Sequence, residues 1–322
     1  MNTADLGGPL LKSVSRSFYL TIRILPARIQ APIGLAYLLA RASDTIADTA
    51  EASEPVRLHH LAAFGKMIRD GASEGLPELQ REIQPPDPGE RELIAKLDRC
   101  FAWLVTLPES DRREIAGVLE KIICGQTLDL QRFPKGDGVI ALQTAAELDE
   151  YTYLVAGCVG EFWTRICLAH LPQYSRASES ELLRLGVNYG KGLQLVNILR
   201  DMPADLEAGR CYLPGSELKN IGIPPALLHD SPAEGQPVFD LWTLRARELL
   251  DQGRLYIMAL RSRRTRMACF LPWRLGVDTL NLFTHQPPLM TGKKVKVSRA
   301  TVRKALVQSV HVAFSNKLLI AG

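Results

Sequence analysis

The stretch that decides the fold is Gly192-Leu-Gln-Leu-Val-Asn-Ile-Leu-Arg-Asp-Met-Pro-Ala-Asp205. Its polar side chains recur at steps of three and four residues, so they share one face of a helix whose other faces are apolar. They are Gln194, Asn197, Asp201 and Asp205. Such a stripe faces either solvent or an internal polar cavity. We favour the cavity, because a solvated face usually carries Lys and Glu rather than Gln and Asn.

A second stretch, Ile33-Gly-Leu-Ala-Tyr-Leu-Leu-Ala-Arg-Ala-Ser-Asp-Thr-Ile-Ala-Asp48, repeats the spacing. Asp44 and Asp48 lie four residues apart on one helix face, and Tyr37 and Arg41 continue that face backwards. Two like charges at this spacing repel each other. The arrangement makes sense if a hard cation such as Mg²⁺ bridges them together with phosphate oxygens. The alternative is a solvated acidic end of a core helix.

Helical periodicity also dominates the rest of the chain, and strand signals are nearly absent. The clear breaks are the segments 71–89, 133–138 and 209–237, which are rich in Gly and Pro. We therefore predict an all-α protein with one domain over residues 1–322. The predicted helices are 31–49, 55–71, 88–106, 110–131, 144–170, 178–205, 238–263, 267–285 and 298–319.

The bulk composition fits a globular protein that binds small anions. Hydrophobic residues make up 46% of the chain, which allows a large core, and the net charge is +4. That excess is too small to indicate a nucleic-acid partner, and it suits anionic small molecules or a lipid surface. No stretch reaches the roughly 18 apolar residues of a membrane helix, and no signal peptide is visible. We expect a cytoplasmic protein without a transmembrane anchor, at most peripheral to the inner membrane.

Two matched carboxylate pairs are far more specific than either alone. Together they can hold several magnesium ions that bind the oxygens of a diphosphate and neutralise charge on the leaving group, which is how an allylic diphosphate is ionised. Arginines flank both pairs, and a planar guanidinium suits phosphate oxygens. These arginines are Arg41, Arg200 and Arg210.

Several motifs occur in an order that resembles the squalene/phytoene synthase family, over roughly residues 13 to 300. They are Ser15-Arg16-Ser17-Phe18, the first Asp motif, Tyr151-x-x-x-Val155-Ala-Gly-x-Val-Gly160 and Gln194-x-x-Asn-Ile-x-Arg-Asp201. The resemblance implies an isoprenoid-synthase-type helical bundle around a central cavity, with the two Asp-rich helices facing each other. It also implies the head-to-head condensation of two prenyl diphosphates through a cyclopropyl intermediate.

The resemblance assigns a role to each matching residue. The expected magnesium ligands are Asp44, Asp48, Asp201 and Asp205, with Mn²⁺ as a substitute metal. Tyr151 is expected to assist proton removal in the first half-reaction, although a tyrosine on an apolar helix is more often a core residue. The expected diphosphate contacts are Ser15, Arg16, Tyr37, Arg41, Gln194, Asn197, Arg200 and Arg210.

The chain also departs from the family pattern. Ala47 and Ala204 stand where animal and fungal squalene synthases carry an additional acid, so fewer carboxylates are available to the metals. Pro203 lacks a backbone donor and should kink or end its helix, which makes the placement of Asp205 less secure than that of Asp201. Gly157 and Gly160 weaken a helix by about 1 kcal/mol each relative to Ala, and their use is room for close approach of another helix or an apolar ligand.

The product depends on the basic segment Gly292-Lys-Lys-Val-Lys-Val-Ser-Arg299. A similar segment in squalene synthases is linked to NADPH, so Lys296 and Arg299 are expected to bind NADPH; the alternative is a solvated basic loop. We expect farnesyl diphosphate or another prenyl diphosphate as substrate, squalene as product, no nucleic acid, and membrane contact for product release. The alternatives are phytoene, dehydrosqualene or hydroxysqualene synthase without a reductant, or a non-enzymatic assembly-factor relative. A head-to-tail terpene cyclase is disfavoured, because its Asp-Asp-x-x-Asp motif is missing.

Overall fold

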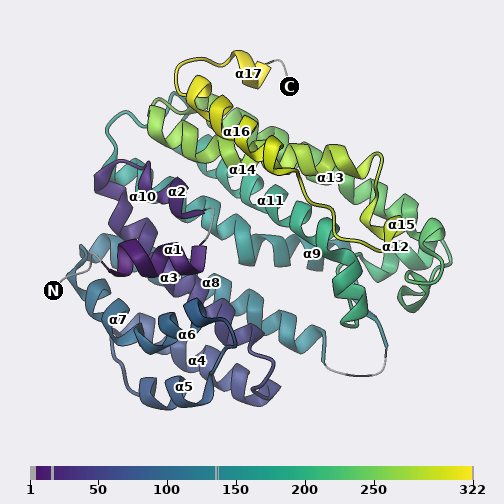
Figure 1. Ribbon diagram of the computed structural model, residues 1–322, viewed down its shortest axis with the longest axis horizontal. Coiled ribbons are helices and arrows are strands. Elements are labelled where there is room, and N and C mark those ends of the chain that lie inside the picture. The colour runs from purple at the N-terminus through teal and green to yellow at the C-terminus, as the bar shows by residue number, and fades with distance from the viewer. Residues whose placement is uncertain (1–4, 16–17, 135, 137, 321–322) are drawn as a thin grey trace. The chain divides into compact units, whose positions relative to one another are not determined.

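Helices form nearly all the regular structure, as the periodicity predicts. The protein, a computed structural model, is described over residues 5–15, 18–134, 136 and 138–320 (Figure 1). The all-α prediction is confirmed, since the described strands are two pieces of two residues each. None of the described helices is both long and apolar enough to cross a bilayer.

Contacts divide the chain into two compact units, each with a core of its own. Unit 1 comprises residues 1–130 and 165–172, and unit 2 comprises 131–164 and 173–322. The prediction of one domain over 1–322 stays a prediction.

Unit 1 is built around α3 (Ala27–Asp48), which is buried on most of its faces. Leu35, Leu38 and Leu39 have no solvent-accessible surface, and neighbouring helices α1, α4, α6 and α7 pack on α3. The elements of this unit are π-helix η1 (Leu6–Leu10), α1 (Leu11–Ser15), α2 (Phe18–Arg23), α3, α4 (Glu54–Asp70), α5 (Leu76–Glu82), α6 (Pro88–Ala95), α7 (Leu97–Thr106), most of α8 (Glu109–Arg132) and the end of α10 (Cys158–His170).

Unit 2 is organised by the long helices α11 (Glu179–Glu207) and α13 (Pro232–Ala259), which pack along each other. In Figure 1, α14 (Arg263–Phe283) lies alongside α13, and α16 (Arg299–Val312) lies alongside α14. The remaining elements are β1 (Ile140–Ala141), α9 (Ala145–Thr152), π-helix η2 (Tyr153–Gly157), the start of α10, β2 (Arg210–Cys211), α12 (Gly215–Asn220), 3₁₀-helix η3 (Pro225–Leu227), α15 (Pro288–Thr291) and α17 (Lys317–Ile320).

The structure corrects several predicted boundaries. The predicted helix 88–106 is two helices that meet at Lys96, and 144–170 is interrupted by the π-helical turn at 153–157. Residues 298–319 form α16 and the short α17. The predicted break 209–237 ends early because α13 begins at Pro232, since proline is well suited to the first turn of a helix.

Close backbone contacts confirm the use predicted for the glycines of the Tyr151 motif. A Cβ added at Gly160 would lie 2.0 Å from the carbonyl oxygen of Gly186 on α11. One added at Gly190 would lie 2.2 Å from the carbonyl oxygen of Ala156. Since no side chain fits at such distances, these glycines let η2 and α10 pack directly against α11.

Candidate active site

The first carboxylate pair lies at the C-terminal end of α3. Asp44 is partly exposed, and Asp48 one turn later is exposed. The helix end itself is held by Arg57 of α4, a buried residue whose Nη1 donates to the carbonyl oxygen of Ala47 at 2.6 Å. A helix C-terminus carries partial negative charge, so a buried guanidinium stabilises it and fixes the turn that carries both carboxylates.

Arg41 joins this pair to α6. Its Nη1 donates to Asp44 Oδ2 at 2.6 Å, and its Nη2 donates to Glu90 Oε1. Its Nε is buried and has no hydrogen-bond partner among the described residues. Arg41 therefore lies between two carboxylates and keeps one unused donor.

The charge on Asp44 is only partly compensated. Burial raises the pKa of its carboxyl from 3.8 to about 6, and the nearby Asp48 and Glu90 raise it further, whereas Arg41 opposes the change. Repulsion between carboxylates is what a bound cation would relieve. The raised pKa thus reflects first the burial of Asp44 and then the three carboxylates gathered around Arg41.

Tyr37 lies one turn before Arg41 on the same face of α3. Its ring stacks on Phe18 with centroids 5.0 Å apart, and its hydroxyl approaches the carbonyl oxygen of Val14 at 3.4 Å. Burial raises the pKa of Tyr37. Ser15, the residue after Val14, is buried and donates its hydroxyl to the carbonyl of Leu11. The predicted contact Arg16 lies outside the described residues.

The second carboxylate pair lies near the end of α11. Gln194, Arg200, Asp201 and Asp205 are partly exposed and Asn197 is exposed, so the polar stripe is open along its length. The prediction that Pro203 could end the helix was wrong. Helix α11 continues through Pro203, which is buried, to Glu207.

Asp201 is held by two cations. Arg200 donates Nε to Oδ1 at 2.8 Å and Nη2 to Oδ2 at 2.9 Å, and Lys294 Nζ lies 2.8 Å from Oδ1. Burial alone would raise the pKa of Asp201, but the hydrogen bonds from Arg200 and Lys294 lower it overall. Asp201 is thus held in its ionised form, with both oxygens engaged by Arg200 and Oδ1 also by Lys294.

Asp205 pairs with Arg210, which lies five residues later, just beyond the end of α11. β2 pairs in parallel with β1, with Arg210 opposite Ile140, and this pairing fixes the chain just after α11. Arg210 Nη2 donates to Asp205 Oδ1 at 2.7 Å. The structure thus pairs two side chains that were predicted separately, Asp205 as a metal ligand and Arg210 as a diphosphate contact.

Tyr151 lies on α9 and is connected to the same segment. Its ring stacks on that of Tyr212, two residues after Arg210, with centroids 5.1 Å apart and planes at 24°. The π-helical turn η2 begins two residues after Tyr151, and such turns occur often at functional sites. Tyr151, Tyr212 and the Asp205–Arg210 pair thus form one neighbourhood within unit 2.

The basic segment 292–299 contacts the second carboxylate pair through Lys294, a residue that was not predicted from the sequence. Lys294 contacts Asp201, whereas the predicted NADPH residues Lys296 and Arg299 are exposed. Glu90, the second partner of Arg41, was also missed, as was Tyr212. Only the run of three lysines within four residues could have pointed to Lys294.

The donor set at each pair fits magnesium. Within the described part of the chain, no group of three or more His, Cys, Asp or Glu side chains is arranged to hold a metal ion. Each pair offers two carboxylates, and Mg²⁺ in proteins typically takes one or two carboxylates and completes its shell with phosphate oxygens and water. The uncompensated charge at Asp44 and the unused donor of Arg41 agree with a metal–diphosphate ligand.

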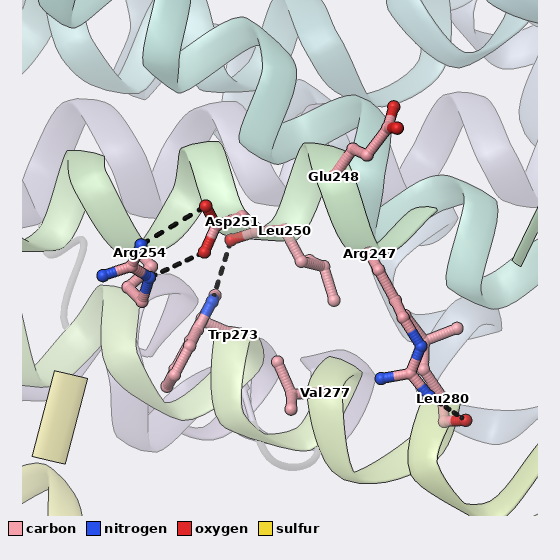
Figure 2. Close-up of a pocket in the computed structure, with 8 residues that line it drawn as sticks. All are labelled: Arg247, Glu248, Leu250, Asp251, Arg254, Trp273, Val277 and Leu280. Carbon is pink, nitrogen blue, oxygen red and sulfur yellow. Dashed lines mark hydrogen bonds and ion pairs between the residues drawn. The ribbon is translucent and has the colours of Figure 1, made fainter. Parts of the chain in front are cut away.

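A hollow of about 360 Å³ between α13 and α14 is a separate feature of unit 2. Figure 2 shows that both of its arginines are already engaged: Arg254 pairs with Asp251 at 2.7 Å, and Arg247 donates to the carbonyl of Leu280 at 2.9 Å. Trp273 donates its Nε1 to the carbonyl of Leu250. The hollow contains none of the predicted site residues.

Residues 11–301 match the squalene/phytoene synthase family model, and the chain belongs to that family. The chain is 29% identical over 219 residues to a bifunctional lycopene cyclase/phytoene synthase of Gibberella fujikuroi, covering 67% of this chain and 36% of that protein. It is 24% identical over 320 residues to a squalene synthase of Mycosarcoma maydis, covering 94% of this chain and 54% of that protein. The chain therefore spans only part of the length of these relatives.

Solved structures show the same fold. TcSQS in complex with the ligand E5700 matches with a TM-score of 0.78 at 20% identity, covering 99% of this chain and 91% of that one. A dehydrosqualene synthase in complex with a ligand matches with a TM-score of 0.64 at 22% identity, covering 94% and 93%. The predicted isoprenoid-synthase-type fold is confirmed.

Proposed function

We propose that this protein condenses two prenyl diphosphates head to head, with magnesium held by both carboxylate pairs. The observation that carries the proposal is the paired arrangement of carboxylate and arginine on two separate helices. Asp44 has Arg41, while Asp201 and Asp205 have Arg200 and Arg210. Membership of the squalene/phytoene synthase family supports the same reaction class.

In this proposal, Asp44 and Asp48 hold metal in unit 1, and Asp201 and Asp205 hold metal in unit 2. Bound magnesium would act as a Lewis acid that neutralises charge on the diphosphate leaving group. The arginines beside each pair bind the remaining phosphate oxygens in a planar, charge-assisted geometry. In Arg41 both terminal nitrogens already donate to Asp44 and Glu90, so its Nε is the donor left for a phosphate oxygen.

Tyr151 is proposed to assist removal of a proton from the substrate carbon in the first half-reaction. Its ring is held face to face against Tyr212, which fixes the position of the ring on α9. Tyr151→Phe keeps the stacked ring and removes only the hydroxyl. We expect this variant to lose most of its turnover with little change in KM.

We propose squalene as the product, with farnesyl diphosphate as substrate and NADPH as reductant. The supporting observation is that the 292–298 segment is tied by Lys294 to Asp201, so basic residues adjoin a proposed metal ligand. The second candidate is a phytoene or dehydrosqualene type of reaction without reductant. It is supported by the higher identity, 29%, to proteins whose names include phytoene synthase.

The test is pyrophosphate release from farnesyl diphosphate by the wild type and by Asp44→Asn and Asp201→Asn. Each variant is expected to fall below about a tenth of the wild-type rate, because a lost metal ligand acts in the transition state. Asp70→Asn, an exposed carboxylate at the end of α4, is the matched control and should retain full activity. Full activity of either site variant would remove that residue from the proposed metal site.

A further inference from the structure

A second pocket lies in unit 2, where the ends of several elements meet. It has a volume of about 320 Å³ and is formed by the loop after α10, the turn between α13 and α14, and the turn after α16. Its lining includes Arg176, Arg261, Arg263 and Arg266, together with Phe314 and Asn316. Because of these four arginines we call it the arginine pocket.

The arginine pocket is lined by four cationic side chains and by no carboxylate. None of the four arginines makes an ion pair within the residues that the structure describes. Arg266 is only 5% exposed, and its guanidinium is satisfied by neutral acceptors, among them the carbonyl oxygens of Val312 at 2.9 Å and Leu260 at 3.2 Å. A buried positive charge without a counter-ion is costly unless an anion joins it.

A neighbouring arginine, Arg176, adds to this excess of positive charge around Arg266. Burial lowers the pKa of Arg266, and the nearby Arg176 lowers it further. In the α13–α14 hollow of Figure 2, by contrast, Arg254 has a carboxylate partner in Asp251. The arginine pocket therefore differs from an ordinary charged surface hollow in lacking the anion that would balance it.

An exposed apolar row adjoins the pocket. Val307 and Val310 lie on the solvent face of α16, and Phe314, 68% exposed, continues that face into the following turn. Arg263 sits over the Phe314 ring at 4.6 Å from its centroid. Residues at spacings of three and four share a helix face, so the three side chains form one row that ends at the arginine pocket. Ile320 on α17 is 69% exposed as well.

The positive charge of the chain is concentrated in residues 279–322, the segment that carries the apolar row. Residues 279–322 hold seven Lys and Arg and no Asp or Glu. The first 278 residues consequently carry 32 basic and 35 acidic side chains, so the segment is +7 and the rest of the chain is −3. Apolar side chains beside concentrated positive charge are typical of surfaces that bind anionic lipid.

We propose that the arginine pocket binds the phosphate group of an anionic phospholipid while Val307, Val310 and Phe314 enter the lipid interface. The row of apolar side chains distinguishes this occupant from a free phosphate ion, which would use the arginines alone. The pocket and the row involve none of the proposed catalytic residues. The inference thus stands whether or not the proposed reaction is correct.

The test is co-sedimentation of the full chain with vesicles of phosphatidylcholine alone or with about 30 mol% phosphatidylglycerol, at about 0.1 M salt. Wild type is expected to bind the anionic vesicles strongly and the neutral ones weakly. Arg261 and Arg263 are exposed, so R261Q/R263Q should keep the fold and lose about tenfold or more in binding. V310S/F314S should also weaken binding, since the apolar contribution is removed.

R245Q is the matched control, because Arg245 is an exposed arginine of α13 that pairs with Glu248 at 3.0 Å. It should change vesicle binding by less than about twofold, and circular dichroism should match wild type for every variant. Equal binding of wild type to both vesicle types would overturn the proposal, as would R261Q/R263Q binding like R245Q. Thermal stabilisation by inorganic phosphate without vesicle binding would assign the pocket to free phosphate and overturn the lipid proposal too.

Discussion

Asp44→Asn is expected to stabilise the metal-free protein at neutral pH while it removes activity. The folded pKa of Asp44 is raised to about 6 because burial, Asp48 and Glu90 all disfavour the ionised carboxyl. The folded state then holds this proton more tightly than the unfolded state. The free energy of unfolding therefore falls as pH rises through about 4 to 6 and stays low above that range. An asparagine at this position has no ionisable carboxyl, so the variant does not carry the free-energy cost of ionising Asp44 in the folded state.

The size of the gain follows from the structure. A rise from 3.8 to about 6 corresponds to about 3 kcal/mol as an upper limit. The Asp44 side chain is 43% exposed, so solvent screening reduces this figure. The variant also weakens the 2.6 Å contact with Arg41, although Arg41 keeps Glu90. We expect a net gain of about 1 kcal/mol, or a melting temperature about 2–4 °C higher.

The assay is urea unfolding with a metal chelator at about pH 8 and about pH 5. The gain should be roughly halved at the lower pH, because there the folded Asp44 is mostly protonated while the unfolded one is still mostly ionised. Asp70→Asn should show no comparable gain at either pH. The reasoning would be refuted if Asp44→Asn were less stable than wild type at pH 8. It would also be refuted if the gain in stability were the same at both pH values.

Three further variants test other parts of the structure. Gly190→Ala places a Cβ 2.2 Å from the carbonyl of Ala156 and should lower the free energy of unfolding by more than about 2 kcal/mol. As a control, Gly117→Ala in α8 meets no atom within 4 Å and should be neutral or stabilising. Equal effects of the two variants in urea unfolding would contradict the packing argument. Arg57→Met leaves the carbonyl of Ala47 without its donor and should destabilise by about 1–3 kcal/mol, and an unchanged melting temperature would show that Arg57 does not hold the end of α3. Lys294→Gln frees Asp201 from a competing cation and should lower the magnesium concentration for half-maximal activity; an unchanged magnesium dependence would separate Lys294 from the metal site.

The parts of the fold that depend on local spacing could be predicted from the sequence. Both carboxylate pairs and the polar stripe from Gln194 to Asp205 lie on helices, because their spacing alone fixes a shared face. The short helices α1, α2 and α5 were missed, since five to seven residues are too few to show a helical period. Pro203 was misjudged as a possible helix end, since α11 runs through it to Glu207.

The partners of the site residues could not be predicted in the same way. Glu90 lies 49 residues from Arg41, and Lys294 lies 93 residues from Asp201, so only tertiary packing brings them together. Tyr212 meets Tyr151 because the β1–β2 pair sets the path of the chain after α11. The arginine pocket is likewise assembled from three separate turns, and no stretch of sequence displays it as a unit.

The central claim is that two prenyl diphosphates are joined at sites built on the carboxylate pairs. The most direct measurement is product identification after incubation of the wild type with farnesyl diphosphate and magnesium, with and without NADPH. We predict pyrophosphate release that requires magnesium, presqualene diphosphate without NADPH, and squalene with NADPH. Dehydrosqualene or hydroxysqualene under both conditions would assign the reductant-free reaction. No thirty-carbon product under either condition, together with no pyrophosphate release, would contradict the account.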